Sequence, residues 1–391
     1  MKNIRIKHSF YFLMVLLLLA NYSQQPSEFN YISAANYEGS FHHSQIFSAG
    51  AWEITQGSKD IIVAIIDSGI DYSVPDINKT AWINTDEIFN NSIDDDGNGY
   101  VDDVYGWDFV SNDSFPGPED DDPVHWHATF IAGLIAAPKD NIGIVGVAPN
   151  VTVMNIRILQ ADNYNGVTME DFGNAIKYAV DNGADVINLS LHYYPNSTDY
   201  YDDILYAISQ NVPIVSVTGN TWLPTGGREI PSFPGAYEEV IDVGATNTVK
   251  VKADYSNYGE WTDLVAPVGD EDAVDIRSCV PPDQYWYGWG TSFACPQVVG
   301  VIALMKSLNS SLTVDDIKYI LYHSATDLGE EGKDIYYGYG MLNASKAVRA
   351  VLDPSILIPP TTEKSSYMAL STLFMMVTVV MLIIRSSKKN K

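Results

Sequence analysis

Two histidines, His125 and His127, follow a run of acidic residues in the window EDDDPVHWHATFIAG at 119–133. Histidines two positions apart beside carboxylates can hold a divalent metal. One of them can instead act as a catalytic base, with the other as a bystander. A solvated loop also collects Asp and His without any chemistry. This window alone therefore leaves three interpretations open.

A serine in a reactive setting lies in the window YGWGTSFACPQVVGVIALM, where small residues surround Ser292 and an apolar helical pattern follows at once. A serine at the start of a helix gains from the positive end of the helix dipole when an oxyanion forms beside it. Asp67 in IIDSGID and His127 in HATFIAG precede it, in the order Asp, His, Ser. These three residue types are the parts of a nucleophilic catalytic triad.

Buried strands must bring these residues to one edge of a sheet. The stretch DIIVAIIDSGID at 60–71 is an apolar, β-branched run ending in Asp-Ser-Gly, which predicts a buried parallel strand followed by a loop. Four similar runs follow, NVTVMNIRIL, ADVINLSL, VPIVSVTGN and EVIDVGATN, with helix-like stretches such as MEDFGNAIKYAVDNG between them. This alternation predicts an α/β fold with helices on both faces of a parallel sheet. Functional residues are then expected in the loops after Ile66, Leu189 and Val217.

The three windows and the stretches that join them resemble the subtilase family of subtilisin-type serine peptidases. The likeness runs from about Phe47 to Leu352 and includes GAWEITQGSKDIIVAIIDSGID, GIVGVAPNVTVMNIRIL, YAVDNGADVINLSL, KADYSNYGEWTDLVAP and DIYYGYGMLNASKAV. The resemblance implies a subtilisin-like fold and a serine endopeptidase that cleaves peptide bonds through an acyl-enzyme.

The resemblance also decides between the two histidines. In the family pattern the catalytic histidine stands a fixed distance before Ala-Gly, and counting back from Ala132 places it at His127. His127 would take the proton of Ser292 and later hand it to the leaving amine, while Asp67 holds the imidazole in the correct tautomer. His125 then becomes a loop residue, and the metal interpretation of this window is abandoned.

Further site residues follow from the same resemblance. Asn220 in VTGN matches the family asparagine whose side-chain amide donates to the oxyanion. The residues expected to bind substrate beside the P1 position, the residue before the cleaved bond, are Ser190, Leu191, His192 and Gly219.

Two departures from the family pattern motivate an alternative function. Ala128 stands where the family has glycine directly after the base, and its methyl group could displace His127. His192 and Tyr193 stand where glycines usually border the P1 pocket, so a preference for large apolar P1 residues is not carried over. The alternative is a catalytically weak or inactive subtilase-fold binding protein at the cell surface. A peptidase for one dedicated precursor is a narrower form of the first interpretation.

The loop NSIDDDGNGYVDDVYGWDF predicts a structural calcium site. Counted from Asp94, oxygen-bearing side chains stand at positions 1, 3, 5 and 9, and Gly99 stands at position 6, as in an EF-hand loop. Tyr105 occupies position 12, so the usual bidentate glutamate is missing. A turn that needs no ion is the alternative. The predicted ligands are Asp94, Asp96, Asn98, Tyr100 and Asp102, completed by Asp103.

The two ends of the chain predict a membrane-anchored protein. Residues 1–22 read as a signal peptide, 37–353 as the catalytic domain and 354–366 as a stalk. Residues 367–384 form an uncharged apolar run that is long enough to span a bilayer, and 385–391 form a basic tail. We expect a single-pass type I protein whose catalytic domain is extracellular or lumenal. The short stretch before that domain has no room for a folded propeptide, so folding is expected to be unaided or assisted in trans.

Charge and cysteine content limit the partners. The 391-residue chain carries a formal net charge of −27, which disfavours nucleic acid and favours cations or basic peptides, although solubility alone also explains an acidic surface. The expected partners are a protein or peptide substrate and a membrane, with no nucleic acid. The two cysteines, Cys279 and Cys295, exclude a disulfide framework. One bridge between them is the alternative outside the cell, and two separate thiols are expected.

Overall fold

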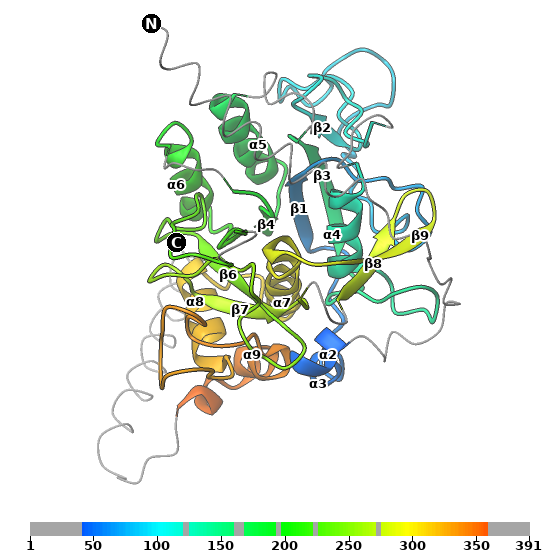
Figure 1. The fold of residues 1–391 in the computed structure, drawn as a ribbon. Coiled ribbons are helices and arrows are strands. Elements are labelled where there is room, and N and C mark those ends of the chain that lie inside the picture. The colour runs from blue at the N-terminus through cyan, green and yellow to red at the C-terminus, as the bar shows by residue number, and fades with distance from the viewer. Residues whose placement is uncertain are drawn as a thin grey trace, which may run out of the picture.

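A parallel sheet of seven strands forms the centre of the protein, in the order β2-β3-β1-β4-β5-β6-β7 (Figure 1). The computed structural model describes residues 41–119, 125–159, 168–192, 197–221, 226–270 and 275–358. The strands of this sheet are β1 (Ile62–Asp67), β2 (Gly106–Asp108), β3 (Thr152–Arg157), β4 (Val186–Asn188), β5 (Ile214–Val217), β6 (Ile241–Thr246) and β7 (Leu264–Pro267). Two further strands, β8 (Ile276–Val280) and β9 (Gln284–Gly288), form a separate antiparallel hairpin.

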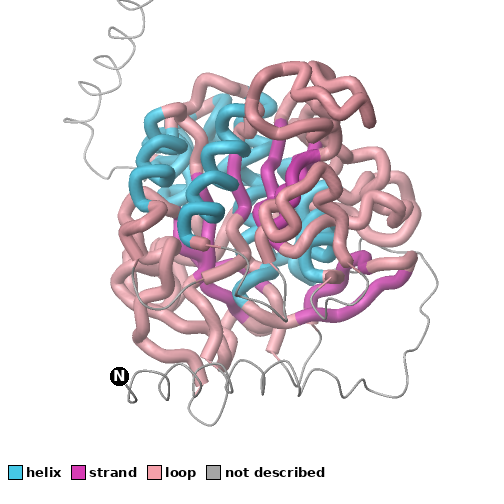
Figure 2. The backbone as a smooth tube through the Cα atoms, turned by 90° about the horizontal axis from the view of Figure 1, so that it is seen from above, coloured by secondary structure: helices cyan, strands magenta, loops and turns pink. Residues whose placement is uncertain are grey.

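Helices cover both faces of this sheet, as Figure 1 shows and Figure 2 repeats from a second direction. The described helices are α2 (Phe41–Gln45), α3 (Ser48–Trp52), α4 (His127–Ala136), α5 (Met169–Asp181), α6 (Tyr201–Ser209), α7 (Cys295–Leu308), α8 (Val314–Ser324) and α9 (Ala344–Leu352), with 3-10 turns η2 (Thr291–Phe293) and η3 (Pro354–Leu357). One apolar core joins the sheet to α4, α7, α8 and α9, and a second core on the opposite face joins it to α5 and α6.

Alternating side chains of each strand supply the two cores. In β1, Val63 and Ile65 belong to the larger core and Ala64 and Ile66 to the smaller one. Because both faces are buried, the strand reads in sequence as a continuous apolar run. The five predicted strands and the predicted α/β class with helices on both faces are therefore confirmed.

The ends of the described body pack against each other. The backbone N–H of Ala344, at the start of α9, donates to the carbonyl of Ile46, between α2 and α3, at 2.8 Å. After α9 the turn η3 continues the folded body, and its Leu357 is buried in the larger core. Folded residues thus extend a few positions past 353, the last residue of the predicted catalytic domain, into the predicted stalk at 354–366.

Within the residues described, one helical segment is long and apolar enough to cross a membrane, Thr291–Leu308. Because 83% of this window is buried inside the protein, it is a core helix. The predicted signal peptide and the predicted span at 367–384 lie outside the described residues, and both remain predictions. Cys279 and Cys295 are buried free thiols, as expected.

Candidate active site

Asp67 and His127 meet where β1 ends and α4 begins. Asp67 is fully buried, and its Oδ1 accepts a hydrogen bond from the backbone N–H of Ser68 at 2.7 Å. The same oxygen lies 2.8 Å from Nδ1 of His127, whose side chain is 17% exposed. A buried carboxylate on Nδ1 leaves Nε2 as the ring nitrogen that can exchange a proton with another group.

The residue after His127 fits without disturbing this contact. Ala128 is fully buried in the larger core, and its backbone N–H donates to Oγ of Ser68 at 3.1 Å. This hydrogen bond ties the first turn of α4 to the loop after β1. The methyl group that replaces the family glycine is therefore accommodated, and the bond between Asp67 and His127 is intact.

Ser292 lies in η2, directly before α7. Its Oγ donates to the carbonyl of Ser190 at 3.2 Å, and Oγ of Ser190 donates back to the carbonyl of Ser292 at 2.8 Å. The next residue, Phe293, lies against the imidazole of His127, with ring centroids 5.7 Å apart. The sheet and the two helix starts therefore bring Asp67, His127 and Ser292 into one region.

Asn220 lies immediately beside this serine. Its Oδ1 accepts hydrogen bonds from the backbone N–H of Thr291 at 2.9 Å and from the Thr291 hydroxyl at 3.0 Å. Two donors on Oδ1 fix the orientation of the amide. The amide nitrogen is then the group available to donate to a negative oxygen next to Ser292.

The predicted substrate-binding residues follow β4 and β5. Ser190 and Leu191 are buried, and His192 is half-buried. Burial lowers the pKa of His192 to about 4, so this imidazole is neutral at pH 7 and is not turned into bulk water. Gly219, at φ 83°, adopts a backbone conformation that favours glycine, and its carbonyl accepts from the N–H of Asn257 at 2.9 Å. Tyr193 lies outside the described residues.

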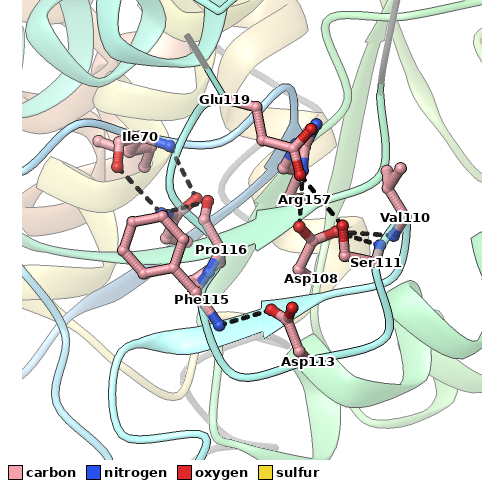
Figure 3. A network of polar contacts seen from close by, with 10 residues as sticks. Ile70, Asp108, Val110, Ser111, Asp113, Phe115, Pro116, Glu119 and Arg157 are labelled. Carbon is pink, nitrogen blue, oxygen red and sulfur yellow. Dashed lines mark hydrogen bonds and ion pairs between the residues drawn. The ribbon is translucent and has the colours of Figure 1, made fainter.

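A buried ion cluster joins β3 to β2 and to the loop that follows β2 (Figure 3). Arg157, at the end of β3, is fully buried, and its Nη1 lies 2.7 Å from Asp108 and 3.0 Å from Glu119. In Figure 3 these three side chains converge from β3, from β2 and from the loop after β2. The sequence motifs did not predict this cluster. An arginine at a position that the strand pattern predicts to be buried is the signal that could have found it.

The loop predicted to bind calcium is ordered largely by its own backbone. The carboxylate of Asp94 accepts from the N–H groups of Gly97 at 2.8 Å and Gly99 at 2.9 Å. The carboxylate of Asp102 accepts from those of Asn91 and Ser92 at 2.8 and 2.9 Å. Both carboxylates therefore accept hydrogen bonds from main-chain donors independently of any ion.

A cluster of three carboxylates lies beside this loop, formed by Glu87, Asp96 and Asp103, with one oxygen of each within 4.8 Å of the others. The amide of Asn98 donates to Asp96 at 3.1 Å and to Asp103 at 3.0 Å. Burial raises the pKa of Asp103, which means that its charged form is disfavoured there. Carboxylate oxygens are ligands that calcium prefers, so the donor set fits this ion.

Of the five predicted calcium ligands, Asp96 belongs to the carboxylate cluster and Asn98 contacts it. The ring of Tyr100 packs on Trp107 and Tyr178. Glu87 was not among the predicted ligands, because it precedes the EF-hand-like loop and only the fold brings it near.

The chain is similar to known proteins over most of its length. A model of the subtilase family matches residues 58–340. The chain is 34% identical to the thermophilic serine proteinase of Bacillus sp. (strain AK1) over 299 residues, which are 76% of this chain and 64% of that protein. It is 32% identical to thermitase of Thermoactinomyces vulgaris over 300 residues, 76% of this chain and 92% of thermitase. It is 31% identical to halolysin of Haloferax mediterranei over 315 residues, 80% of this chain and 53% of halolysin.

Proposed function

Because the chain belongs to the subtilase family, we propose that it is a serine endopeptidase that cleaves peptide bonds with Asp67, His127 and Ser292. The observation that carries the proposal is the hydrogen bond of 2.8 Å between His127 and the buried Asp67, with Ser292 at the start of a core helix in the same region. The match to serine peptidases supports the reaction class, and the chemistry of the residues supports their individual roles.

The reaction begins when Oγ of Ser292 attacks the peptide carbonyl while Nε2 of His127 takes its proton. In the structure Oγ donates to the carbonyl of Ser190, so a rotation about χ1 of Ser292 must turn it toward the imidazole. Asp67 accepts a hydrogen bond from Nδ1 and stabilises the imidazolium. His127 then gives its proton to the leaving amine, and water hydrolyses the acyl-enzyme by the same route.

Two donors stabilise the oxyanion in this scheme. They are the amide nitrogen of Asn220 and the backbone N–H of Ser292, and Thr291 holds the first of them in place. The turn η2, which holds Ser292, leads through Ala294 into α7, so the positive end of that helix adds to the stabilisation.

Cleavage of a quenched fluorescent peptide library by the full chain tests this function. The wild type should cleave, Ser292→Ala should not, and His125→Ala should cleave as the wild type does. Absence of cleavage by the wild type, together with retained binding of peptides, would favour the alternative of a subtilase-fold binding protein.

We also propose that calcium binds beside the loop at 94–102. The carboxylate cluster of Glu87, Asp96 and Asp103 supports this, because like charges at such distances repel unless a cation lies among them or a carboxyl is protonated. Bound calcium would offset this repulsion and stiffen the loop. Isothermal titration of the calcium-depleted protein with calcium tests the proposal, with Asp96→Asn expected to weaken binding and Glu331→Gln, an exposed acid elsewhere, expected to leave it unchanged.

The proposed location is the outer face of a membrane, with a signal peptide at 1–22 and an anchor at 367–384. The support is compositional, namely an apolar run near each end and four basic residues after the second run. Protease protection of an epitope placed after Lys391 in sealed vesicles tests this orientation. The epitope should be protected while the catalytic domain is digested.

A further inference from the structure

Among the residues that the structure describes, the buried acid Asp242 accepts no hydrogen bond from any side chain or backbone group. Asp242, in the second position of β6, is fully buried, with a relative exposure of 0%. Both of its carboxylate oxygens lack a partner within the described part of the chain. Burial and the nearby charge of Asp263 raise the pKa of Asp242 well above its usual value. Leaving such a group unsatisfied is unfavourable, so its position calls for a ligand that satisfies it.

The carboxyl of Asp242 lies next to a glycine that leaves room for it. A Cβ atom on Gly235 would lie 2.2 Å from Oδ1 of Asp242 and 2.9 Å from the carbonyl oxygen of Val217. The acidic group, the glycine and the end of β5 therefore converge. Ser232, which begins the turn containing Gly235, is also fully buried, and its Oγ has no partner among the described residues. Two polar groups without partners thus lie around one turn.

Asp242 lies one strand away from the segments that carry the predicted substrate-binding residues. On β5, Ser216 is the registered neighbour of Asp242, and its Oγ donates to the carbonyl of Leu191 at 3.2 Å. The last of the described backbone hydrogen bonds between the two segments runs from the N–H of Leu189 to the carbonyl of Val215 at 2.9 Å, just past the register pair Asn188–Val215. A substrate side chain that reaches Asp242 would have to enter beyond this last backbone hydrogen bond, between the segments that carry Leu191 and Gly219.

Because Asp242 lies deep in the protein, only a long substrate side chain could reach its carboxyl group. Gly219 lies three residues beyond Ser216, at most roughly 10 Å at about 3.3 Å per extended residue. A side chain that starts beside Gly219 must be long to reach the level of Asp242. His192, which follows Leu191 in the chain, is neutral at pH 7 because burial lowers its pKa to about 4, so it does not repel a cation.

The carboxylate of the neighbouring Asp263 already has partners. Oδ2 of Asp263 accepts from the backbone N–H of Asp242 at 3.1 Å, and its Oδ1 lies 3.4 Å from Nζ of Lys333. Among the described residues, no cation forms an ion pair with Asp242 itself. The group that satisfies this carboxyl can therefore come from a bound substrate.

We propose that Asp242 is a specificity-determining residue that selects substrates with arginine or lysine at P1, an inference that rests on the proposed peptidase function. The guanidinium or ammonium group would pair with the Asp242 carboxylate, and the hydroxyl of Ser232 would accept a second hydrogen bond. The enzyme would thereby favour basic sites in polypeptides, in keeping with its strongly acidic composition.

The test uses the full chain and peptide substrates that differ only at P1, where they carry arginine, lysine, citrulline or leucine. Citrulline has the shape of arginine without its charge. The wild type should cleave the arginine and lysine substrates with kcat/KM about 10²-fold above citrulline and leucine, because truncating a buried charge pair has effects of this size or larger. Asp242→Asn should lose that factor on arginine and lysine and keep its kcat/KM on leucine. The matched control Asp263→Asn should retain the wild-type ratio.

Each of the other outcomes contradicts either the inference or the proposed function. A wild type that cleaves citrulline as fast as arginine, or prefers leucine, overturns the inference whether or not Asp242→Asn folds. An Asp242→Asn protein with an unchanged ratio of arginine to citrulline does the same and leaves Asp242 as a structural acid. If a fluorophosphonate labels Ser292 but no basic substrate is cleaved, the inference alone fails. If Ser292 is not labelled and no peptide is cleaved, the proposed function fails and the inference falls with it.

Discussion

Replacing Arg157 by methionine should destabilise the protein strongly, because it removes the cation from a buried ion cluster. Arg157 is fully buried and contacts the buried Asp108 at 2.7 Å and the part-exposed Glu119 at 3.0 Å. Methionine retains much of the packing volume, so the main change is an uncompensated carboxylate at Asp108. Breaking a buried pair in this way typically costs about 3–5 kcal/mol.

The assay is thermal unfolding of wild type and variant at fixed calcium concentration. At about 2–3 °C per kcal/mol for a domain of this size, Arg157→Met should lower Tm by roughly 6–15 °C. Lys177→Met is the matched control, because Lys177 pairs with Asp181 at 3.2 Å while both side chains are largely exposed. Its Tm should equal that of the wild type within error, since water screens such a pair.

The pH dependence of the Arg157→Met deficit gives a second check. Burial raises the pKa of Asp108 even with Arg157 present. A carboxyl whose folded pKa exceeds its unfolded pKa binds a proton more readily in the folded state, so protonation favours folding as pH falls. Removing Arg157 raises this pKa further. The deficit should therefore be full at neutral pH and shrink as pH falls through the folded pKa of Asp108.

Two results would refute this reasoning. One is an Arg157→Met protein that melts with the Lys177→Met control. The other is a deficit that is the same at pH 5 and pH 8, which would indicate lost packing rather than an uncompensated charge.

The remaining predictions concern the active site, the ion and the anchor. Any single alanine replacement in the triad should lower kcat by on the order of 10⁴-fold or more, and combined replacements should add little, as steady-state kinetics would show for Asp67, His127 and Ser292. Asn220→Ala should lower kcat by about 10²–10³-fold with KM nearly unchanged, and an equal loss in KM alone would contradict an oxyanion role. Removal of calcium by excess EGTA should lower Tm by several degrees in the wild type but not in Asp96→Asn, and equal shifts in both would exclude Asp96 as a ligand. Truncation after Glu363 should release the protein into the medium, whereas retention in the membrane fraction would argue against the anchor.

The fold was largely predictable because its strands are buried on both faces. β1, β3, β4, β5 and β6 read as continuous apolar runs, and the pattern of each is local. The helix α5 also carries its own start signal, the capping box in which Thr168 and Asp171 exchange hydrogen bonds. The strands β2 and β7 and the β8–β9 hairpin were not predicted. β2 contains Gly106 and Asp108, residue types that strands disfavour, β7 ends in Pro267, and β9 is partly exposed.

The site residues also fall into two groups, those that local motifs predict and those that only the fold identifies. Asp67, His127 and Ser292 stand in short local motifs, so the amino-acid sequence alone is enough to recognise their windows. Arg157 depends on contacts between segments about fifty residues apart, with Asp108 49 positions earlier. Glu87 lies only a few positions before the loop but outside the EF-hand-like spacing, so the motif did not include it. Asp242 shows this limit most clearly, because an acid inside an apolar run is visible in the sequence, whereas its lack of a partner among the described residues is a property of the fold.

The most direct test of the proposed mechanism is to find where a fluorophosphonate reacts. We expect one adduct per chain, mapped by peptide mass spectrometry to Ser292, and formed at the wild-type rate in His125→Ala but very slowly in His127→Ala. No adduct on a folded wild-type protein, or an adduct on Ser292 that forms equally fast without His127, would contradict the mechanism.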